Sequence, residues 1–154
     1  MILSDGQIIQ LMKTKELVIH GFREKNLTPN GYDVSVAEIS ISGGEPIKEG
    51  EIIIPKGTWF AVSTEEYFEF PGNIAGQIWI RTSWARKGVL ASFGMIDAGF
   101  NGNLTLSAFN THQDIEMPIG DTFAQIAFLM LGDCADKTYE VRSGHYQGQK
   151  GIKL

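Results

Sequence analysis

Two short segments of the chain hold residue types that suit chemistry on a phosphate group. The first is a lone carboxylate, Asp97, which stands between Gly94 and Gly99 and directly precedes a β-rich run. The second is Arg81-Thr82-Ser83, in which a guanidinium group stands beside two hydroxyl groups. Arginine and hydroxyl donors hold phosphate oxygens, and a carboxylate can orient and activate water for attack on phosphorus. If both segments converge on one polyphosphate, the pattern favours nucleotide chemistry.

Each of these residues also has a purely structural interpretation, which the spacing leaves open. Asp97 could stabilise its own turn, and an arginine directly after a strand is commonly solvated. Arg86, shortly after Arg81, is either a pocket cation or an exposed helix residue. Asp33 either supports a neighbouring pocket or forms an Asx turn.

The size and charge of the chain limit what it can bind. At 154 residues we expect one domain over residues 1–154, which buries about two-thirds of the surface that its unfolded form exposes. Thirteen basic and eighteen acidic residues give a net charge of −5, which argues against generic binding to nucleic acid or to an anionic membrane. A single cysteine excludes an internal disulfide, and no apolar run approaches the roughly 18 residues of a membrane span. We therefore expect a cytoplasmic protein with neither nucleic acid nor membrane as a partner.

Short strands dominate the elements that must position the chemical residues. Ser4 and Gln7 have the spacing of a capping box, so the pattern predicts a short N-terminal helix. Residues 83–87 lack strand alternation and end at Gly88, which indicates a short internal helix whose start presents free N–H groups to a phosphate. Runs rich in β-branched and aromatic residues alternate with glycine and proline turns and predict an all-β sandwich or jelly-roll-like barrel. The expected strands are residues 34–39, 51–54, 59–63, 74–80, 104–109 and 123–131.

Four segments, in this order, resemble the motifs of the dUTPase and dCTP deaminase superfamily. They are Asn30-Gly31-Tyr32-Asp33-Val34, Arg81-Thr82-Ser83, Gly94–Gly102 and Pro118–Gln125. The resemblance covers residues 1–151 and implies an all-β, distorted jelly-roll or β-clip barrel of the dUTPase type, with a short N-terminal helix and one short internal helix. It also implies a homotrimer that binds a pyrimidine deoxynucleoside triphosphate, dUTP or dCTP, with Mg²⁺. The triphosphate and water would hold the ion, with Asp33 near its water shell and no direct protein ligand.

The resemblance assigns roles to individual residues. Asp97 becomes the catalytic carboxylate, and Phe100 stacks on the deoxyribose and excludes a 2′-hydroxyl, unless it is a core residue as most phenylalanines in β-rich chains are. Residues 143–154 become a flexible tail that closes over the nucleotide, although their composition alone fits either a frayed end or a segment that a partner orders. The substrate-binding set is Arg81, Thr82, Ser83, Arg86, Gly94, Phe100, Gln125, Tyr146 and Gln149.

The two branches of the superfamily differ at one position. The deaminase branch uses a glutamate in the strand after the third motif, and Ser107 stands at that position here. A serine hydroxyl is too weak an acid and base to relay protons near neutral pH. Ala98-Gly99-Phe100 and the tail residues 145–151 nevertheless resemble the deaminase branch, and Thr122 stands where dUTPases have an arginine. We predict a dUTP diphosphatase that releases dUMP and pyrophosphate; the alternatives are a dCTP deaminase, alone or bifunctional, and a nucleotide-binding regulator without turnover.

Overall fold

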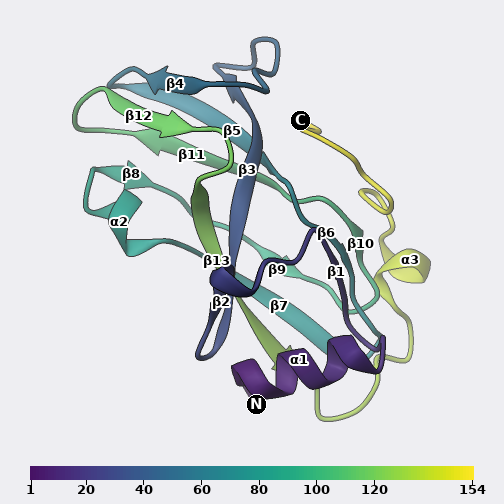
Figure 1. The fold of residues 1–154 in the computed structure, drawn as a ribbon. Helices are drawn as coiled ribbons and strands as arrows, with labels where there is room; N and C mark the ends of the chain where they lie inside the picture. The colour runs from purple at the N-terminus through teal and green to yellow at the C-terminus, as the bar shows by residue number, and fades with distance from the viewer.

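A curled antiparallel sheet of eight strands forms the body of the computed structural model, which describes residues 1–154 (Figure 1). The strand order is β8-β11-β5-β3-β13-β7-β9, and β2 pairs with β3. A three-stranded sheet, β1-β6-β10, and a two-stranded sheet, β12-β4, complete the fold. The strands are β1 Val18–His20, β2 Leu27–Thr28, β3 Gly31–Ile41, β4 Glu51–Ile54, β5 Thr58–Thr64, β6 Tyr67–Glu69, β7 Ile74–Ile80, β8 Val89–Leu90, β9 Met95–Ile96, β10 Asn101–Gly102, β11 Thr105–Asn110, β12 Ile115–Pro118 and β13 Thr122–Met130.

The helices are short and lie at the ends and edges of the sheets. They are α1 Asp5–Lys13, the 3₁₀ turn η1 Glu24–Asn26, α2 Thr82–Ala85 and α3 Tyr139–Arg142. The predicted capping box is present at α1, where the Ser4 side chain accepts a hydrogen bond from Gln7 N and Gln7 Oε1 accepts one from Ser4 N. None of the helices has the length and apolar character that a bilayer crossing requires.

Strand β3 curls the large sheet because it changes partner along its length. Its first half, Tyr32–Ser35, pairs with β13, and its second half, Val36–Ile41, pairs with β5. The register with β5 shifts between Val36 and Glu38, which marks a β-bulge. A bulge bends the strand and increases its twist, so one continuous strand can serve two parts of the barrel. The all-β fold that the sequence predicts is therefore confirmed, in the form of a curled antiparallel sheet.

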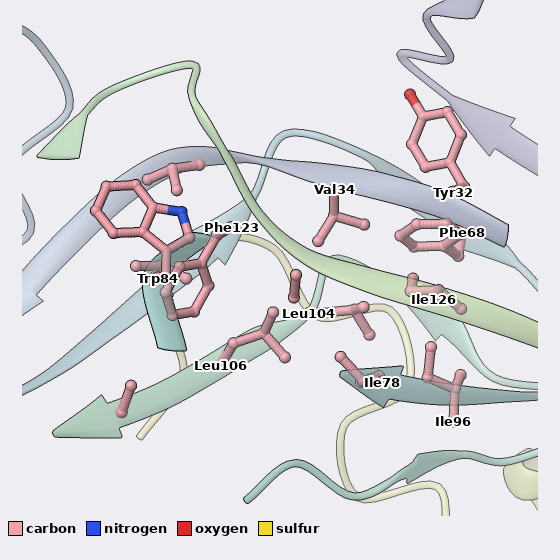
Figure 2. Close-up of a cluster of buried hydrophobic side chains, with 14 of the residues drawn as sticks. Tyr32, Val34, Phe68, Ile78, Trp84, Ile96, Leu104, Leu106, Phe123 and Ile126 are labelled. Carbon is pink, nitrogen blue, oxygen red and sulfur yellow. The ribbon is translucent and has the colours of Figure 1, made fainter. Parts of the chain in front are cut away.

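The core fills the space inside the curl. Figure 2 shows Leu104 and Leu106 beside Ile78, with Trp84 and Phe123 at one end of the cluster and Tyr32 and Phe68 at the other. Trp84 anchors α2 because its ring packs near Phe123 and its Nε1 donates a hydrogen bond of 2.8 Å to the Thr122 carbonyl oxygen. The segment that carries Arg81, Thr82 and Ser83 is thus fixed to the start of β13.

Every strand expected from sequence is present, with ends that differ by at most three residues. The predicted internal helix also exists as α2, and the Gly88 that follows it has a φ of +91°. Helix α3, the 3₁₀ turn η1 and strands β1, β2, β6, β8, β9, β10 and β12 were not predicted. All of them are two to four residues long, too short for a periodic pattern, and each of these strands except β2 exists because a distant segment pairs with it.

A buried polar cluster joins β3 to the loop before β6. Glu66 is completely buried, and its Oε2 accepts a hydrogen bond of 2.9 Å from Ser35 N. Tyr32 lies beside it, and its hydroxyl donates to Glu66 Oε1 at 3.4 Å. Burial raises the pKa of Tyr32 to about 12. Burial also raises the pKa of the Glu66 carboxyl above its ordinary value, against the lowering effect of the Ser35 hydrogen bond.

This cluster predicts a pH-dependent stability. Because the pKa of Glu66 is raised in the folded state, its protonated side chain contributes fully to the free energy of unfolding below the pKa of the unfolded state. That contribution is lost as the pH rises through the pKa of the folded state. The always neutral Glu66→Gln variant should therefore gain stability relative to wild type as the pH rises above 4.5, by up to about 1.4 kcal/mol per pH unit. Urea unfolding of both proteins from about pH 4 to about pH 8 measures the difference. A difference that does not change with pH would contradict the prediction.

Candidate functional site

The predicted catalytic carboxylate lies in a hollow of about 550 Å³ between the Asp97 turn, the edge of β11 and the C-terminal segment. Ten of the eighteen lining residues are hydrophobic, which suits a nucleoside. The structure brings together five residues of the predicted site here: Gly94, Asp97, Phe100, Tyr146 and Gln149. We call this cavity the acidic hollow, because Asp97 is the one acidic side chain that lines it.

The turn around Asp97 is closed by backbone hydrogen bonds that do not use the Asp97 carboxylate. Phe100 N donates a hydrogen bond of 3.1 Å to the main-chain carbonyl of Asp97, so the turn closes without the side chain. Asp97 is exposed, and none of the hydrogen bonds or ion pairs of the structure involves its carboxylate. Gly99 has a φ of +85°, and a Cβ at this position would lie 2.5 Å from Thr138 Cβ. Close packing against Thr138 therefore holds the turn, and the Asp97 side chain is available to a ligand.

Phe100 is both a core residue and a wall of the acidic hollow. It is 6% exposed, and its ring makes an edge contact with Tyr139 at 5.5 Å between ring centroids. The Tyr139 hydroxyl in turn accepts a hydrogen bond of 3.0 Å from Tyr146 N. Tyr139 therefore links the Asp97 turn to the C-terminal segment. Sequence analysis missed it because no local pattern distinguishes this tyrosine from a surface residue.

The C-terminal segment pairs with the strand that follows the Asp97 turn. Gly148 N donates to Asn101 O at 2.8 Å, and Asn103 N donates to Gln149 O at 3.0 Å. The Gln149 side chain also donates to Asn103 O at 2.5 Å. In Figure 1 this segment, drawn in yellow, runs beside β10 and β6. Residues 143–154 therefore contain a segment that is held by hydrogen bonds to its own chain, an arrangement different from the frayed end and the partner-ordered segment that composition left open.

The remaining predicted residues, except Arg86, gather in a second, smaller hollow of about 270 Å³. Its lining residues are Thr28, Asp33, Ile80, Arg81, Thr82, Ser83 and Gln125. Arg81 Nε lies 2.9 Å from Asp33 Oδ2, and the Arg81 guanidinium also contacts the Thr122 hydroxyl. The Gln125 side chain donates to Thr28 Oγ1 at 2.6 Å. We call this cavity the cationic hollow.

Charge in the cationic hollow is partly compensated. Burial raises the pKa of the Asp33 carboxyl above its ordinary value, and the adjacent Arg81 guanidinium pulls it back down. Thr82 and Ser83 are exposed and are the first two residues of α2, so their backbone N–H groups have no partner within the helix. Arg86 caps the end of α2, is exposed and lines neither hollow. Thr28 and Thr122, which sequence analysis did not assign to a site, position Gln125 and Arg81.

The two hollows share no lining residue. Figure 1 draws α2 and the C-terminal segment on opposite sides of the molecule. Within one chain, the expected convergence of Arg81 and Asp97 on a single cavity therefore does not occur. Ser107 lines the acidic hollow, exposed on β11.

Comparison with known proteins identifies the family. A sequence family described as dCTP deaminase-like matches residues 40–131. The chain belongs to the dCTP deaminase-like family. One curated relative, a dCTP deaminase of Pyrococcus abyssi, is 40% identical to this chain over 144 residues, which cover 91% of this chain and 92% of the relative. A probable deoxyuridine 5′-triphosphate nucleotidohydrolase of Sulfolobus islandicus rod-shaped virus 1 is 30% identical over 157 residues, which cover 100% of this chain and 98% of the relative.

Solved structures agree on the fold of this dCTP deaminase-like protein. The 2′-deoxycytidine 5′-triphosphate deaminase of Agrobacterium tumefaciens superposes with a TM-score of 0.73 at 18% identity, over 84% of this chain and 48% of that one. The EIAV dUTPase superposes with a TM-score of 0.57 at 22% identity, over 79% of this chain and 93% of that one. The family match and the curated relatives, together with this shared fold, confirm that the chain belongs to the dUTPase and dCTP deaminase superfamily, as the four motifs predicted.

Proposed function

We propose that this protein is a dUTP diphosphatase, which hydrolyses dUTP to dUMP and pyrophosphate. One observation carries the proposal. Asp97 is the one acidic side chain in the acidic hollow, and Ser107 lines that hollow where the deaminase branch has its glutamate. Water attack on phosphorus needs one carboxylate, whereas replacement of an amino group needs a proton relay that serine does not supply. The nucleotidohydrolase name of the viral relative supports the same assignment.

In this mechanism Asp97 accepts a proton from a water molecule and aims its oxygen at the α-phosphorus. A bond forms between that oxygen and the α-phosphorus, the bond from the α-phosphorus to the bridging oxygen breaks, and pyrophosphate leaves with the electron pair. Phe100 would lie against the deoxyribose and exclude a 2′-hydroxyl. Arg81, Thr82 and Ser83 would hold the phosphate oxygens through paired guanidinium, hydroxyl and backbone donors.

We further propose that Mg²⁺ enters with the triphosphate. The cationic hollow contains side-chain oxygens that suit a hard cation or its water shell. They are the Asp33 carboxylate and the hydroxyls of Thr28, Thr82 and Ser83. Asp33 is the residue that would orient the water shell of the ion. When bound, the ion would offset the charge of the phosphates.

The separation of the two hollows supports a homo-oligomer, and we propose a homotrimer. The group that attacks the α-phosphorus and the groups that hold the phosphates must meet at one nucleotide, yet one protomer keeps them apart. A neighbouring copy that presents its cationic hollow to the acidic hollow would complete the site. Large exposed apolar side chains flank both hollows: Met95 lines the acidic one, and Trp79 pairs across the sheet with Gln125 of the cationic one.

The second candidate is dCTP deaminase, alone or combined with diphosphatase activity. The Pyrococcus and Thermococcus relatives named dCTP deaminase, at 35–40% identity, favour it. For this chain, it requires a proton relay other than a glutamate at position 107.

One assay separates the candidates. The pure protein is incubated with Mg²⁺ and either dUTP or dCTP, and pyrophosphate and ammonia are followed. We expect pyrophosphate from dUTP, at least about tenfold faster than from dCTP, and no ammonia from either nucleotide. Ammonia from dCTP would establish the deaminase instead. Tight nucleotide binding without either product would indicate a regulator that does not turn over its ligand.

A further inference from the structure

The last residues of the chain dock on the outer face of the large sheet, apart from the pairing already described. Ile152 N donates a hydrogen bond of 2.5 Å to Glu38 Oε1, and Lys153 N donates one of 3.0 Å to Thr105 Oγ1. Glu38 lies on β3 and Thr105 on β11, and both are register partners of Ser63 on β5, between them. The segment Gly151–Lys153 thus contacts side chains on β3 and β11, in a row whose middle position on β5 is Ser63. Ser63 in the middle of the row is completely buried.

Glu38 faces this segment because of the β-bulge in β3. In an undisturbed strand, Val34, Val36 and Glu38 would point to the same face, since side chains alternate. The register shift between Val36 and Glu38 reverses the alternation, so that Ile39 enters the core and Glu38 turns to the outer face. Glu38 is only 7% exposed, because the C-terminal segment covers its carboxylate.

Shape as well as charge fits the tail to Glu38. Gly151 has a φ of +66°, and a Cβ at this position would lie 2.6 Å from Glu38 Oε1. Only glycine lets the backbone come this close without a shift. The other carboxylate oxygen, Oε2, lies 3.5 Å from Lys48 Nζ, so the charge of Glu38 is partly balanced on its solvent side. A hydrogen bond from an amide to a carboxylate is stronger than one between neutral groups.

We propose that Glu38 is a positioning residue for the acidic hollow: its carboxylate docks Ile152 and so holds Tyr146 and Gln149 over the nucleotide site. Both residues line the hollow, and they precede the docked segment by only a few residues. A tail that spends less time docked leaves a smaller fraction of the protein ready to bind, which weakens the apparent affinity by that fraction. The role in nucleotide binding rests on the proposed function; the docking itself does not.

The first test needs no nucleotide. Hydrogen exchange of the peptide that spans residues 147–154 is compared for wild type and Glu38→Ala in the full-length protein. We expect exchange in this peptide to become at least about tenfold faster in the variant, with the core strands unchanged. Glu38→Gln keeps an oxygen acceptor for Ile152 N and should stay within about threefold of wild type. Glu45→Ala, which removes an exposed carboxylate from the loop after β3, is the matched control and should change nothing.

A double variant tests the contact between the two residues. Gly151→Ala should also speed exchange in the tail, since its new Cβ clashes with Glu38 Oε1. In the Glu38→Ala background the clash partner is gone, so Gly151→Ala should add less than it does alone. Strictly additive effects would show that Gly151 and Glu38 do not act on each other, and would overturn the proposal.

The second test asks whether docking matters to the site. With dUTP as substrate, Glu38→Ala should raise KM about tenfold and leave kcat within about twofold of wild type. Glu38→Gln should have a KM much closer to that of wild type. Unchanged tail exchange in Glu38→Ala would overturn the docking, and faster exchange with an unchanged KM would overturn the positioning role. If wild type neither binds nor hydrolyses dUTP, the proposed function fails, and the exchange comparison alone still decides whether Glu38 holds the tail.

Discussion

Asp97→Asn will lower pyrophosphate release from dUTP by at least about 1,000-fold, within the range that a lost general base costs. Asparagine has nearly the same shape as aspartate and can hold a water molecule, but it cannot take a proton from it. Because the Asp97 carboxylate makes no hydrogen bond or ion pair within the protein, its replacement should not disturb the turn. Steady-state pyrophosphate assays and calorimetric titration with dUTP measure the two effects. We expect the affinity for dUTP to stay within about tenfold of wild type, equivalent to about 1.4 kcal/mol.

Arg81→Ala provides the complementary variant, because Arg81 lies in the cationic hollow and Asp97 in the acidic one. If each site combines hollows from two copies, unfolding and refolding the two inactive variants together should restore activity. At equal mixing, about one quarter of the sites would pair an intact Asp97 with an intact Arg81, since each is present in half of the protomers. No recovery in a refolded mixture would contradict the shared site. Full activity of Asp97→Asn by itself would remove this residue from its catalytic role.

Gly31→Ala will destabilise the protein by about 3 kcal/mol or more, a loss of the size seen for severe overpacking. Gly31 opens β3, and a Cβ at this position would lie 2.3 Å from the main-chain oxygen of Ile126 on β13. That oxygen belongs to the backbone of the central strand pair, so neither strand can move away without breaking neighbouring hydrogen bonds. Urea unfolding measured by tryptophan fluorescence gives the difference in the free energy of unfolding.

The control for Gly31→Ala is the same substitution at Gly6. Gly6 lies in α1, and no atom lies within 4 Å of the position that a Cβ would take there. Alanine at this position should stabilise the protein by about 0.5–1 kcal/mol, because glycine is a poor helix former. A loss of less than about 1 kcal/mol for Gly31→Ala would mean that β3 and β13 can separate locally, against the rigid pairing described above. The predicted larger loss would show that the glycine of the first motif serves strand packing.

Predictions from the sequence were most accurate where the cause is local. The capping box at Ser4 and Gln7, the end of α2 near Gly88 and the strand β7 depend on residues a few positions apart, and all are present in the structure. The turn of the third motif could likewise be predicted from sequence, since it is closed by a backbone hydrogen bond at Asp97 and by Gly99. Grouping Gly94, Asp97 and Phe100 in one site needed only their proximity along the chain and the family resemblance.

Contacts between segments that are distant in the sequence could not be predicted from it. Asp33 pairs with Arg81, Tyr139 joins Phe100 to Tyr146, and Glu38 docks Ile152, yet none of these pairs lies within one element. Each contact exists because the whole sheet brings its strands into register, and the register depends on burial summed over many residues. The bulge in β3 illustrates the point, since a shift of one residue decides whether Glu38 faces the core or the tail.

The amino-acid sequence by itself determined the β-rich composition of the barrel, the turn that presents Asp97 and the serine at position 107, because residue type and near neighbours dictate these features. Only the tertiary structure decided that Arg81, Thr82 and Ser83 line a different hollow from Asp97, and that the C-terminal segment lies across β3, β5 and β11. The physical reason is that strand order and side-chain facing follow from the packing of the entire core, which no segment carries alone.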